Sequence, residues 1–574
     1  LSGLVGSEMC IRDIRYSTAD LITPENAGKL EKAWEFHTGD LPGEGDPHEL
    51  TNQVTPLKVG NTLFICTPHS VAIALDADTG EERWRFDPSI NRDAGYYQHM
   101  TCRGLAYHDG AAAAATADAA EQPSQPAARC ERRLFLPTND GTLMALDAED
   151  GQPCEDFGDA GTVDLKAGLG EGALGVYLPT SPPVVTSKLV IQGGSITDNG
   201  SVDSPGGVIR AYDVKTGELV WNFDPGNPDA TEPLASGETY VRSTPNVWTI
   251  PTADEALGLV YLPMGNQTPD QWSTPRNELA ERFTATLVAL DLATGKVRWE
   301  FQTVHHDLWD RDLPSQPTLV DIDGPQGKVP ALIQPTKRGD LYVLDRRTGK
   351  PIVPVNEMPV PQGTDYGDTT AATQPTSALS YAPQEPLRER DMWGGTPIDQ
   401  MLCRIQFRKL RYEGDFTPPS QGGSLIYPGN VGVFNWPSVA VDPNRQLLFG
   451  APNYLAFISQ MVKRSEVDPD EQMGGGETGL QPNLGAPYMV RLQPFLSVLG
   501  LPCQSPPWGY VTAVDLRTMK KVWMHKNGTS RDSAPLGLPF PVGTPALGGP
   551  IVTAGGVAFM SCLLYTSDAA DDTP

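Results

Sequence analysis

The stretch HHDLWDRD, from His305 to Asp312, holds two adjacent histidines, a tryptophan and three aspartates within eight residues. Carboxylates and imidazoles are groups that proteins use for proton transfer, and carboxylates also bind hard cations such as Ca²⁺. A purely structural repeat does not require such a concentration of these groups. The stretch is therefore the first candidate for chemistry, and the rest of the chain must explain how it is positioned.

The chain repeats a short cassette, Ala-x-Asp-x-x-Thr-Gly followed by Trp. Clear copies are ALDADTGEERW (Ala74–Trp84), AYDVKTGELVW (Ala211–Trp221) and ALDLATGKVRW (Ala289–Trp299), and weaker copies begin at Ala145, Val343 and Ala513. A strand that ends in a tight Asp/Gly turn, followed by a strand that begins near a Trp, is a β-hairpin unit. Its recurrence at intervals of about one propeller blade predicts small sheets repeated around an axis, with each Trp packed between neighbouring sheets.

Composition limits the classes of function. The chain has 574 residues, more than one ordinary core, and no linker divides it into independent domains. Its 58 glycines and 54 prolines show no period, which favours many short strands joined by turns. A formal net charge of −28 at pH 7 argues against nucleic-acid binding. No apolar run approaches the roughly 18 residues needed to span a bilayer.

Both ends of the chain differ from the repeat. Residues 1–13 and 561–574 fit no strand pattern and resemble translated sequencing adapter, so we expect a native segment at 14–560 whose last blade is incomplete. Within it, residues 110–130 are rich in Ala and low in complexity, which is typical of an exposed loop insertion. From 351 to 419 the cassette disappears, which predicts a long excursion from the repeated scaffold.

The eight cysteines leave one pairing open. Cys130 and Cys154 bracket a predicted hairpin, and either a disulfide or two unpaired buried thiols is compatible with that spacing. No role is predicted for Cys102. The chain has neither CxxCH nor a CxxC pair, so it indicates neither attached c-type haem nor zinc. No GxGxxG motif opens a strand–turn–helix unit, so a nicotinamide cofactor is not indicated.

Nine segments, in order, carry a resemblance to a known family. They are RYSTADLITPENAGKLEKAWEFHTGD, TNQVTPLKVG, QHMTCRG, PTSPPVV, GGSITDNGS, GVIRAYDVKTGEL, LVYLPMGNQTPDQW, TVHHDLWDRDLPSQPTL and FTPPSQGGSLIYPGN. Together they are similar to the periplasmic part of membrane-bound quinoprotein dehydrogenases, which use pyrroloquinoline quinone (PQQ). The branch in question oxidises glucose, quinate, shikimate and related polyols. The resemblance implies an all-β fold, an eight-bladed β-propeller of four-stranded antiparallel sheets with the quinone in the central channel.

The implied reaction explains the residue types. Oxidising an alcohol with an ortho-quinone requires a base for the hydroxyl proton and a quinone carbon that accepts hydride. A divalent cation polarises the quinone oxygen as a Lewis acid. A planar aromatic surface supports the ring, and cationic side chains neutralise its three carboxylates.

The catalytic positions come from this resemblance. Asp310, the second aspartate of HHDLWD, matches the family's catalytic base, and Lys337 matches the cation that hydrogen-bonds the quinone oxygens and stabilises charge on the reduced ring. An aspartate that only caps a turn is the alternative for Asp310. Asp307, His305 and His306 could orient Asp310 or be ordinary turn residues, and a structural role is favoured for both histidines.

The resemblance also implies a metal site. Asp198 in SITDN and Asn266 in PMGNQ match metal positions, and with Asp310 they form an all-oxygen set that suits Ca²⁺ or Mg²⁺. Asn199, beside Asp198, matches a metal and cofactor position. Without the surrounding match, TDN would be an ordinary Asx turn.

Three further residues match positions around the cofactor. His99 and Arg103 lie in QHMTCRG, and Trp248 matches the indole on which the quinone plane rests. Core packing is the alternative for any lone tryptophan. One position departs from the family, because Ala451 stands where relatives carry Asn, and Asn453 follows two residues later. Either the loop is re-registered or that contact is lost, so Asn453 is not taken as a site residue.

The resemblance implies a periplasmic enzyme, attached to the bacterial inner membrane through segments outside this chain. It would oxidise a sugar or polyol, glucose to gluconolactone first, and pass electrons to ubiquinone. Quinate, shikimate or another polyol of the same branch is the first alternative. A non-catalytic propeller scaffold is the second, although a scaffold has no need of HHDLWDRD, TDN and Lys337 together. A soluble methanol- or ethanol-type quinoprotein is disfavoured by QHMTCRG, by FTPPS and by the lack of an adjacent Cys-Cys pair.

Overall fold

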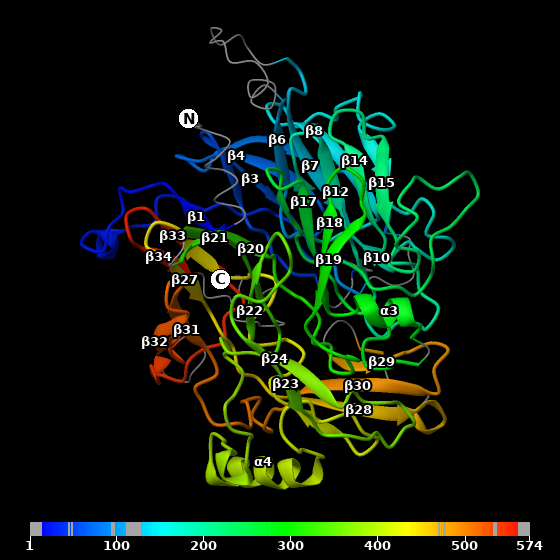
Figure 1. Ribbon diagram of the computed structural model, residues 1–574. Helices are drawn as coiled ribbons and strands as arrows, with labels where there is room; N and C mark the ends of the chain where they lie inside the picture. The colour runs from blue at the N-terminus through cyan, green and yellow to red at the C-terminus, as the bar shows by residue number, and fades with distance from the viewer. Residues whose placement is uncertain are drawn as a thin grey trace.

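The computed structural model describes residues 14–560, apart from 44–45, 47–49, 93–97, 111–127, 275, 325–326, 469–470, 472, 475–477 and 532–536. The ends that we expect to be foreign (1–13 and 561–574) lie outside the described residues, as does most of the insertion at 110–130. Short strands dominate and form many small sheets, so the all-β prediction is confirmed (Figure 1). None of the described helices is long and apolar enough to cross a bilayer.

Six sheets of the described chain have four antiparallel strands. In chain order they are β2 (Leu57–Val59), β3 (Thr62–Cys66), β4 (Ala72–Asp76), β5 (Glu82–Phe86); β6 (Ala106–Asp109), β7 (Arg132–Thr138), β8 (Thr142–Asp147), β9 (Thr162–Asp164); β11 (Val184–Val185), β12 (Leu189–Gln192), β14 (Ile209–Asp213), β15 (Leu219–Phe223); β16 (Thr252–Asp254), β17 (Leu259–Pro263), β18 (Thr286–Asp291), β19 (Val297–Gln302); β25 (Ser424–Ile426), β28 (Phe457–Lys463), β30 (Tyr488–Pro494), β29 (Gly479–Gln481); and β26 (Ala440–Asp442), β27 (Leu447–Gly450), β31 (Tyr510–Asp515), β32 (Lys520–Lys526).

The remaining sheets are smaller. Two have three strands, β20 (Thr318–Gly324), β21 (Gly327–Pro335), β22 (Leu341–Asp345) and β1 (Tyr16–Ser17), β33 (Pro550–Thr553), β34 (Ala558–Met560). Two are pairs, β10 (Tyr177–Leu178) with β13 (Ser195–Ile196) and β23 (Val355–Pro359) with β24 (Thr373–Ser377). The described helices are η1 (Ala27–Lys29), α3 (Glu278–Phe283), η2 (Glu389–Asp391), α4 (Pro397–Lys409) and η3 (Arg464–Glu466). Six four-stranded and two three-stranded sheets are compatible with eight blades, and the blade count stays a prediction.

The cassette builds the contact between neighbouring sheets. Trp221 on β15 donates its indole N–H to the Leu292 carbonyl at 2.9 Å and packs on Gly295 in the turn between β18 and β19. Gly295 has a φ of +70°, and a Cβ there would lie 2.7 Å from the indole. Glycine is therefore required both by the left-handed backbone and by the approach of the ring. The same contact joins Trp34 to Gly80, Trp84 to Gly151 and Trp299 to Gly349. The prediction that the cassette Trp packs between neighbouring sheets is confirmed for Trp84, Trp221 and Trp299.

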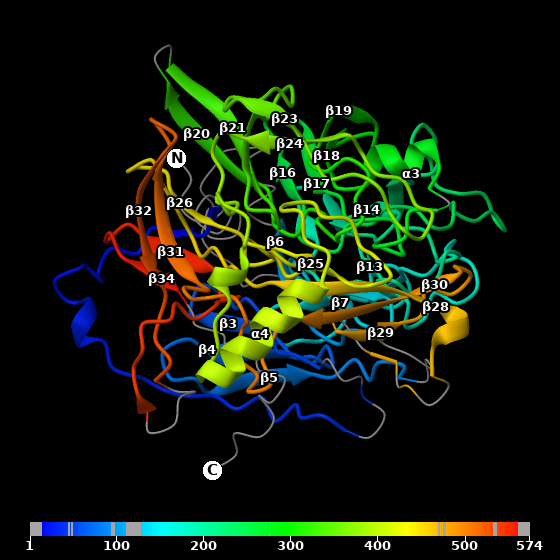
Figure 2. The ribbon, with the colours of Figure 1, turned by 90° about the horizontal axis from the view of Figure 1, so that it is seen from below.

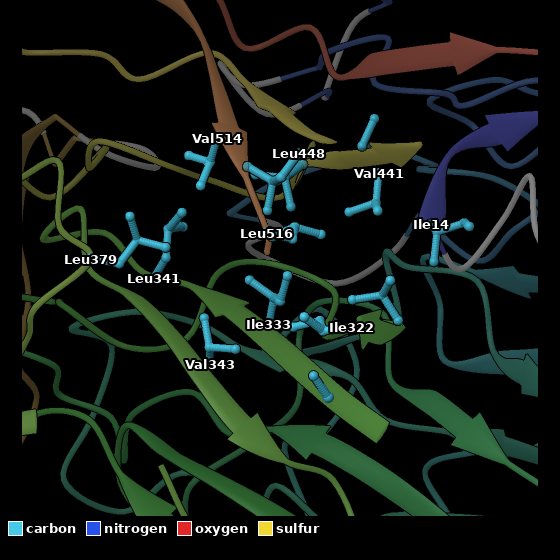
Figure 3. Packing of buried hydrophobic residues seen from close by; sticks show 14 of the residues in the cluster. Ile14, Ile322, Ile333, Leu341, Val343, Leu379, Val441, Leu448, Val514 and Leu516 are labelled. Atoms are coloured by element: carbon cyan, nitrogen blue, oxygen red, sulfur yellow. The ribbon is translucent and has the colours of Figure 1, made fainter. Parts of the chain in front are cut away.

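Hydrophobic side chains fill the space between sheets. One cluster joins β20–β22 with β26, β27 and β31, and includes Ile333, Leu341 and Val514 (Figure 3). Ile14 and Val552, from the two ends of the described chain, belong to the same cluster. Strand β1 pairs with β33 in parallel, which brings these two segments into one sheet.

The excursion predicted at 351–419 contains the β23–β24 pair and α4, which lies at the outer edge of the ribbon (Figure 1). Three disulfides stabilise the described chain: Cys66–Cys102, Cys130–Cys154 and Cys403–Cys503. The Cys130–Cys154 disulfide decides between the two alternatives that the sequence left open, a disulfide and two unpaired thiols. The Cys66–Cys102 disulfide gives Cys102 a structural role that the sequence did not indicate.

Candidate active site

The pocket that carries the candidate chemistry lies where loops from several sheets meet. Six of the eight predicted site residues line it: His99, Arg103, Asp198, Trp248, Asp310 and Lys337. Each sheet supplies its residues from a connection between strands, such as β5–β6, β15–β16, β19–β20 and β21–β22. Repeated sheets place equivalent loops at one end of a propeller, so residues far apart in sequence converge there.

Lys337 lies between two carboxylates of the HHDLWDRD stretch. Its Nζ is 2.7 Å from Asp310 Oδ1 and 2.9 Å from Asp312 Oδ1, and the side chains of Lys337 and Asp312 are each 5% exposed. One ammonium group thus forms ion pairs with two carboxylates of the same turn. The predicted pair of Asp310 and Lys337 is thus brought together, with Asp312 as a partner that the sequence did not single out.

Asp312 also fixes the tryptophan. The Trp248 indole N–H donates to Asp312 Oδ2 at 2.7 Å. Gly265 makes room for this bond, because a Cβ at that position would lie 2.9 Å from Asp312 Oδ2 and 3.0 Å from Trp248 Cδ1. The indole is therefore held by its edge, which leaves a ring face on the pocket side.

Two cations lie over the Trp248 ring. The Arg103 guanidinium carbon is 5.2 Å and Lys337 Nζ is 5.6 Å from the ring centroid. Arg103 donates to Gln53 at 2.8 Å and to Thr180 at 2.6 Å, and it lies 5.8 Å from the Trp436 ring. A flat anion resting on Trp248 would meet both cations, so these residues fit a planar ligand that carries carboxylates.

The turn that presents Asp310 is built around Asp307. The buried Asp307 carboxylate accepts the backbone N–H groups of Trp309 and Arg311 at 2.8 and 2.6 Å and the side-chain amide of Asn266 at 2.9 Å. Burial raises the pKa of Asp307. Asp310 itself has a φ of +56°, a left-handed conformation that surrounding bonds must impose on a non-glycine residue.

A second network joins the loop that carries Asp310 to the loop that carries Lys337. Arg311 and Arg338, the neighbours of Asp310 and Lys337, both bind Asp415, at 2.5 and 2.6 Å. Burial acts to raise the pKa of Asp415, but the two guanidinium groups outweigh it and lower that pKa. Asp415 directly precedes the FTPPS segment, so this segment helps to hold the loops that carry Asp310 and Lys337.

Both histidines of the stretch lie outside the pocket lining. His306 bonds Ser273 at 2.8 Å and pairs with Glu281 at 3.2 Å and Asp368 at 3.8 Å. Burial alone would lower its pKa, but the bonds to Asp368 and Glu281 raise it to about 9. His305 contacts Gln302 and Glu357. The favoured structural role fits these partners, and neither residue contacts Asp310 in them.

Oxygen donors suited to a hard cation lie beside this turn. Asn266 Oδ1 and Asp270 Oδ2 are buried and have no hydrogen-bond partner. Burial and the charges of Asp198 and Asp312 raise the pKa of Asp270 well above its usual range. In the part of the chain that the structure describes, the pocket holds no three His, Cys, Asp or Glu ligand atoms within 4.8 Å of one another. The donor types fit Ca²⁺ or Mg²⁺, and Asp270 joins the predicted set.

Three asparagines lie outside the pocket lining: Asn266, whose amide bonds Asp307 beside the pocket, Asn199 and Asn453. Asn199 has a φ of +48°, donates to Gln481 at 2.7 Å and accepts from the Gln271 backbone at 3.2 Å, so its amide braces a turn rather than lining the pocket. Asn453 exchanges bonds of 2.7 and 2.8 Å with the Ala546 backbone, which agrees with leaving it out of the site.

Sheets joined by Trp–Gly contacts, with an indole, two cations and several carboxylates in one loop-lined pocket, define a β-propeller protein with a site for a planar anion. The family profile "PQQ: Glucose/ethanol/alcohol dehydrogenase, beta-propeller domain" matches residues 11–570, and the chain belongs to this family. The implied family is therefore confirmed, and with it the reading as an enzyme that uses PQQ.

Relatives and solved structures agree with this assignment. The chain is 46% identical over 556 residues to the quinoprotein glucose dehydrogenase of Escherichia coli, covering 95% of this chain and 69% of that protein. It is 47% identical over 567 residues to the enzyme of the same name from Gluconobacter oxydans (95% and 70%) and 41% identical over 567 residues to the quinate/shikimate dehydrogenase (quinone) of Acinetobacter baylyi (95% and 69%). A europium-containing methanol dehydrogenase shares the fold, with a TM-score of 0.59, 22% identity and coverage of 95% and 79%.

Proposed function

We propose that the protein oxidises a sugar, glucose first, with PQQ as its cofactor. The observation that carries the proposal is the buried chain of contacts from Trp248 through Asp312 and Lys337 to Asp310. It provides a stacking surface, a cation and a carboxylate at one pocket. The names of relatives at 46–47% identity support glucose as the first substrate.

In this proposal the residues around the cofactor have distinct tasks. When bound, PQQ supplies the two-electron acceptor for the alcohol carbon. Asp310 takes the hydroxyl proton, because its carboxylate lines the pocket and is held in position by Lys337 at 2.7 Å. Lys337 donates a hydrogen bond to an oxygen of the bound ligand. Trp248 supports the ring, and Arg103 binds a carboxylate through its planar fork.

We further propose a Ca²⁺ or Mg²⁺ ion held by Asp198, Asn266 and Asp310, with Asp270 as an added donor. The unpartnered oxygens of Asn266 and Asp270 support it. The ion would polarise a bound oxygen as a Lewis acid. Transfer of electrons to ubiquinone, a periplasmic location and attachment to the inner membrane through segments outside this chain belong to the same proposal.

Reconstitution tests the activity. The apo-protein is incubated with PQQ, with Ca²⁺ or Mg²⁺, and with both, and glucose oxidation is followed with a dye acceptor. Activity should require both additions, and nicotinamide cofactors should have no effect. Activity that survives exhaustive EDTA treatment followed by PQQ alone would contradict the metal proposal. A ubiquinone analogue in place of the dye tests the acceptor.

A second candidate substrate class has its own support. The quinate/shikimate dehydrogenase of Acinetobacter baylyi is 41% identical over 95% of this chain. The same assay with glucose, quinate, shikimate and glycerol ranks the candidates by kcat/KM. A quinate or shikimate value above that of glucose would replace the first proposal, while the roles of Asp310 and Lys337 would stand.

A further inference from the structure

Helix α4 presents apolar side chains to solvent. Ile398 is 68% exposed, Met401 51%, Leu402 38% and Ile405 45%, and their spacing places them along one face of the helix. These side chains contribute nothing to the buried cores of the described chain. A face of this kind marks an interaction surface more often than ordinary protein surface.

The opposite face of α4 is fixed to the protein. Asp399 and Cys403 are buried, and Cys403 forms the disulfide with Cys503. The Phe407 ring packs at 5.8 Å from the Tyr412 ring. The helix therefore cannot turn its apolar face inward without breaking these contacts. The exposure is a built feature of the fold.

The disulfide joins α4 to a second exposed apolar segment. Val498 is 76% and Leu499 57% exposed, in the loop that precedes Cys503. A Cβ at Gly395, just before α4, would lie 3.2 Å from Leu499 Cδ1, so the loop lies against the start of the helix. We call the six side chains the α4 patch: Ile398, Met401, Leu402, Ile405, Val498 and Leu499.

The charged side chains that α4 exposes beside the patch are positive, and one acid, Glu389, contacts two of the three. The exposed charged residues of α4 are Arg404, Arg408 and Lys409, while its acid, Asp399, is buried. Arg404 and Arg408 also contact Glu389, at 3.0 and 3.5 Å, which holds them along the helix. The whole chain has a net charge of −28, so the surplus of basic side chains beside this apolar patch is opposite in sign to the charge of the protein as a whole.

We propose that the α4 patch docks on an anionic lipid surface, with α4 lying in the interface plane. Aliphatic side chains on one face with Arg and Lys beside them are the composition of interfacial helices. Two orthogonal views place α4 on the outside of the molecule, at its lower edge in Figure 1 and in front in Figure 2. A flat membrane can reach such an element without a matching cavity. The inference does not depend on the proposed activity.

Vesicle flotation tests the docking surface with the whole chain. Vesicles of phosphatidylcholine with about one third phosphatidylglycerol are compared with phosphatidylcholine alone, at about 0.05 and 0.5 M salt. The protein should bind the anionic vesicles, more weakly at high salt. The triple change Ile398→Ser, Met401→Ser, Ile405→Ser should lower binding at least about tenfold, the effect of losing the burial of one such side chain. Arg408→Gln with Lys409→Gln should lower it about fivefold or more.

Matched controls separate docking from misfolding and from self-association. Leu21→Ser with Val522→Ser removes two apolar side chains, 85% and 56% exposed, from other surfaces and should leave vesicle binding unchanged. All variants should keep the melting temperature and the dye-linked activity of the reconstituted protein. Equal binding to both vesicle types, or loss of binding in the control, would overturn the proposal. So would a dimer, seen by light scattering, that the triple change dissociates while no vesicle binds.

Discussion

Two substitutions separate the general base from the charge around Lys337. Asp310→Asn and Asp312→Asn each remove one of the two carboxylates that contact Lys337, at 2.7 and 2.9 Å. The shared effect is the loss of one charged partner of Lys337, which we set at about 1.5–3 kcal/mol, the range for a hydrogen bond to a charged group. Since 1.4 kcal/mol is a factor of ten, this common loss corresponds to roughly 10- to 150-fold in kcat/KM or in cofactor affinity.

Only Asp310→Asn also removes the base and one proposed metal ligand, so the two variants are compared with the metal site filled in both. General-base loss costs about 10²-fold or more in kcat. An Asn at 312 still accepts the Trp248 indole N–H, so that variant should keep the stacking surface. We therefore expect kcat of Asp310→Asn to fall at least about 10²-fold below that of Asp312→Asn, with PQQ bound in both.

Steady-state rates at saturating PQQ, metal and glucose measure the difference, and absorbance of the bound quinone checks loading. The pH profile adds a second readout, because Asp312→Asn should keep the acid limb of kcat and Asp310→Asn should lose it. Equal losses in both variants would show that Asp310 acts only as a charged partner of Lys337 and does not take the proton. Near-normal turnover of Asp310→Asn would remove it from the mechanism.

Three further predictions concern the scaffold. Gly295→Ala should lower the free energy of unfolding by more than the ~1–2 kcal/mol of a left-handed alanine, because its Cβ also meets Trp221, and Trp221→Ala should cost about 3–5 kcal/mol; equal urea midpoints for Gly295→Ala and the parent would contradict the Trp–Gly contact. The pKa of His306 is raised to about 9, so its stabilisation is complete below the unfolded value near 6.5 and is lost as pH rises through 9; His306→Gln should flatten the urea-measured stability over this window, and an unchanged slope would count against the ion pairs. Replacing Cys403 and Cys503 by Ser should cost about 2–5 kcal/mol, given the 100-residue separation, and should loosen α4 first in hydrogen exchange; uniform protection of α4 would argue that its packing suffices.

The repeated contacts could be read from the sequence because they are local in pattern. The cassette specifies a strand, a turn that ends in glycine and a tryptophan, and the same geometry follows wherever it recurs, as at Trp221 and Gly295. Of the three cysteine pairs, the sequence offered only Cys130–Cys154, and left it open. Cys403 and Cys503 are separated by 100 residues, and only the fold brings α4 to that loop.

The residues of the site also divide into those that the sequence predicted and those that it did not. Asp310 and Lys337 were predicted by family resemblance, and the structure brings them to 2.7 Å. Asp312 stands two residues from Asp310 in the same motif, yet its bond to Trp248 spans 64 residues of sequence. Asp270 and Trp436 gave no signal, since a buried acid or a pocket indole is defined only by what folds around it. Asn199 is the opposite case. Its position matches the family motif, but its side-chain amide donates to Gln481 and stabilises a turn.

Charge balance explains why these missed residues matter. Asp198, Asp310 and Asp312 face Arg103 and Lys337 around the pocket, three negative groups against two positive ones. PQQ brings three more carboxylates, so the protein alone would repel it. A divalent cation at the oxygen donors would reverse the sign of the site. Burial, and after it the charges of Asp198 and Asp312, raise the pKa of Asp270, so the acidic neighbours add to the cost of ionising it. Cation and cofactor should therefore bind cooperatively, which is why neither alone is expected to restore activity.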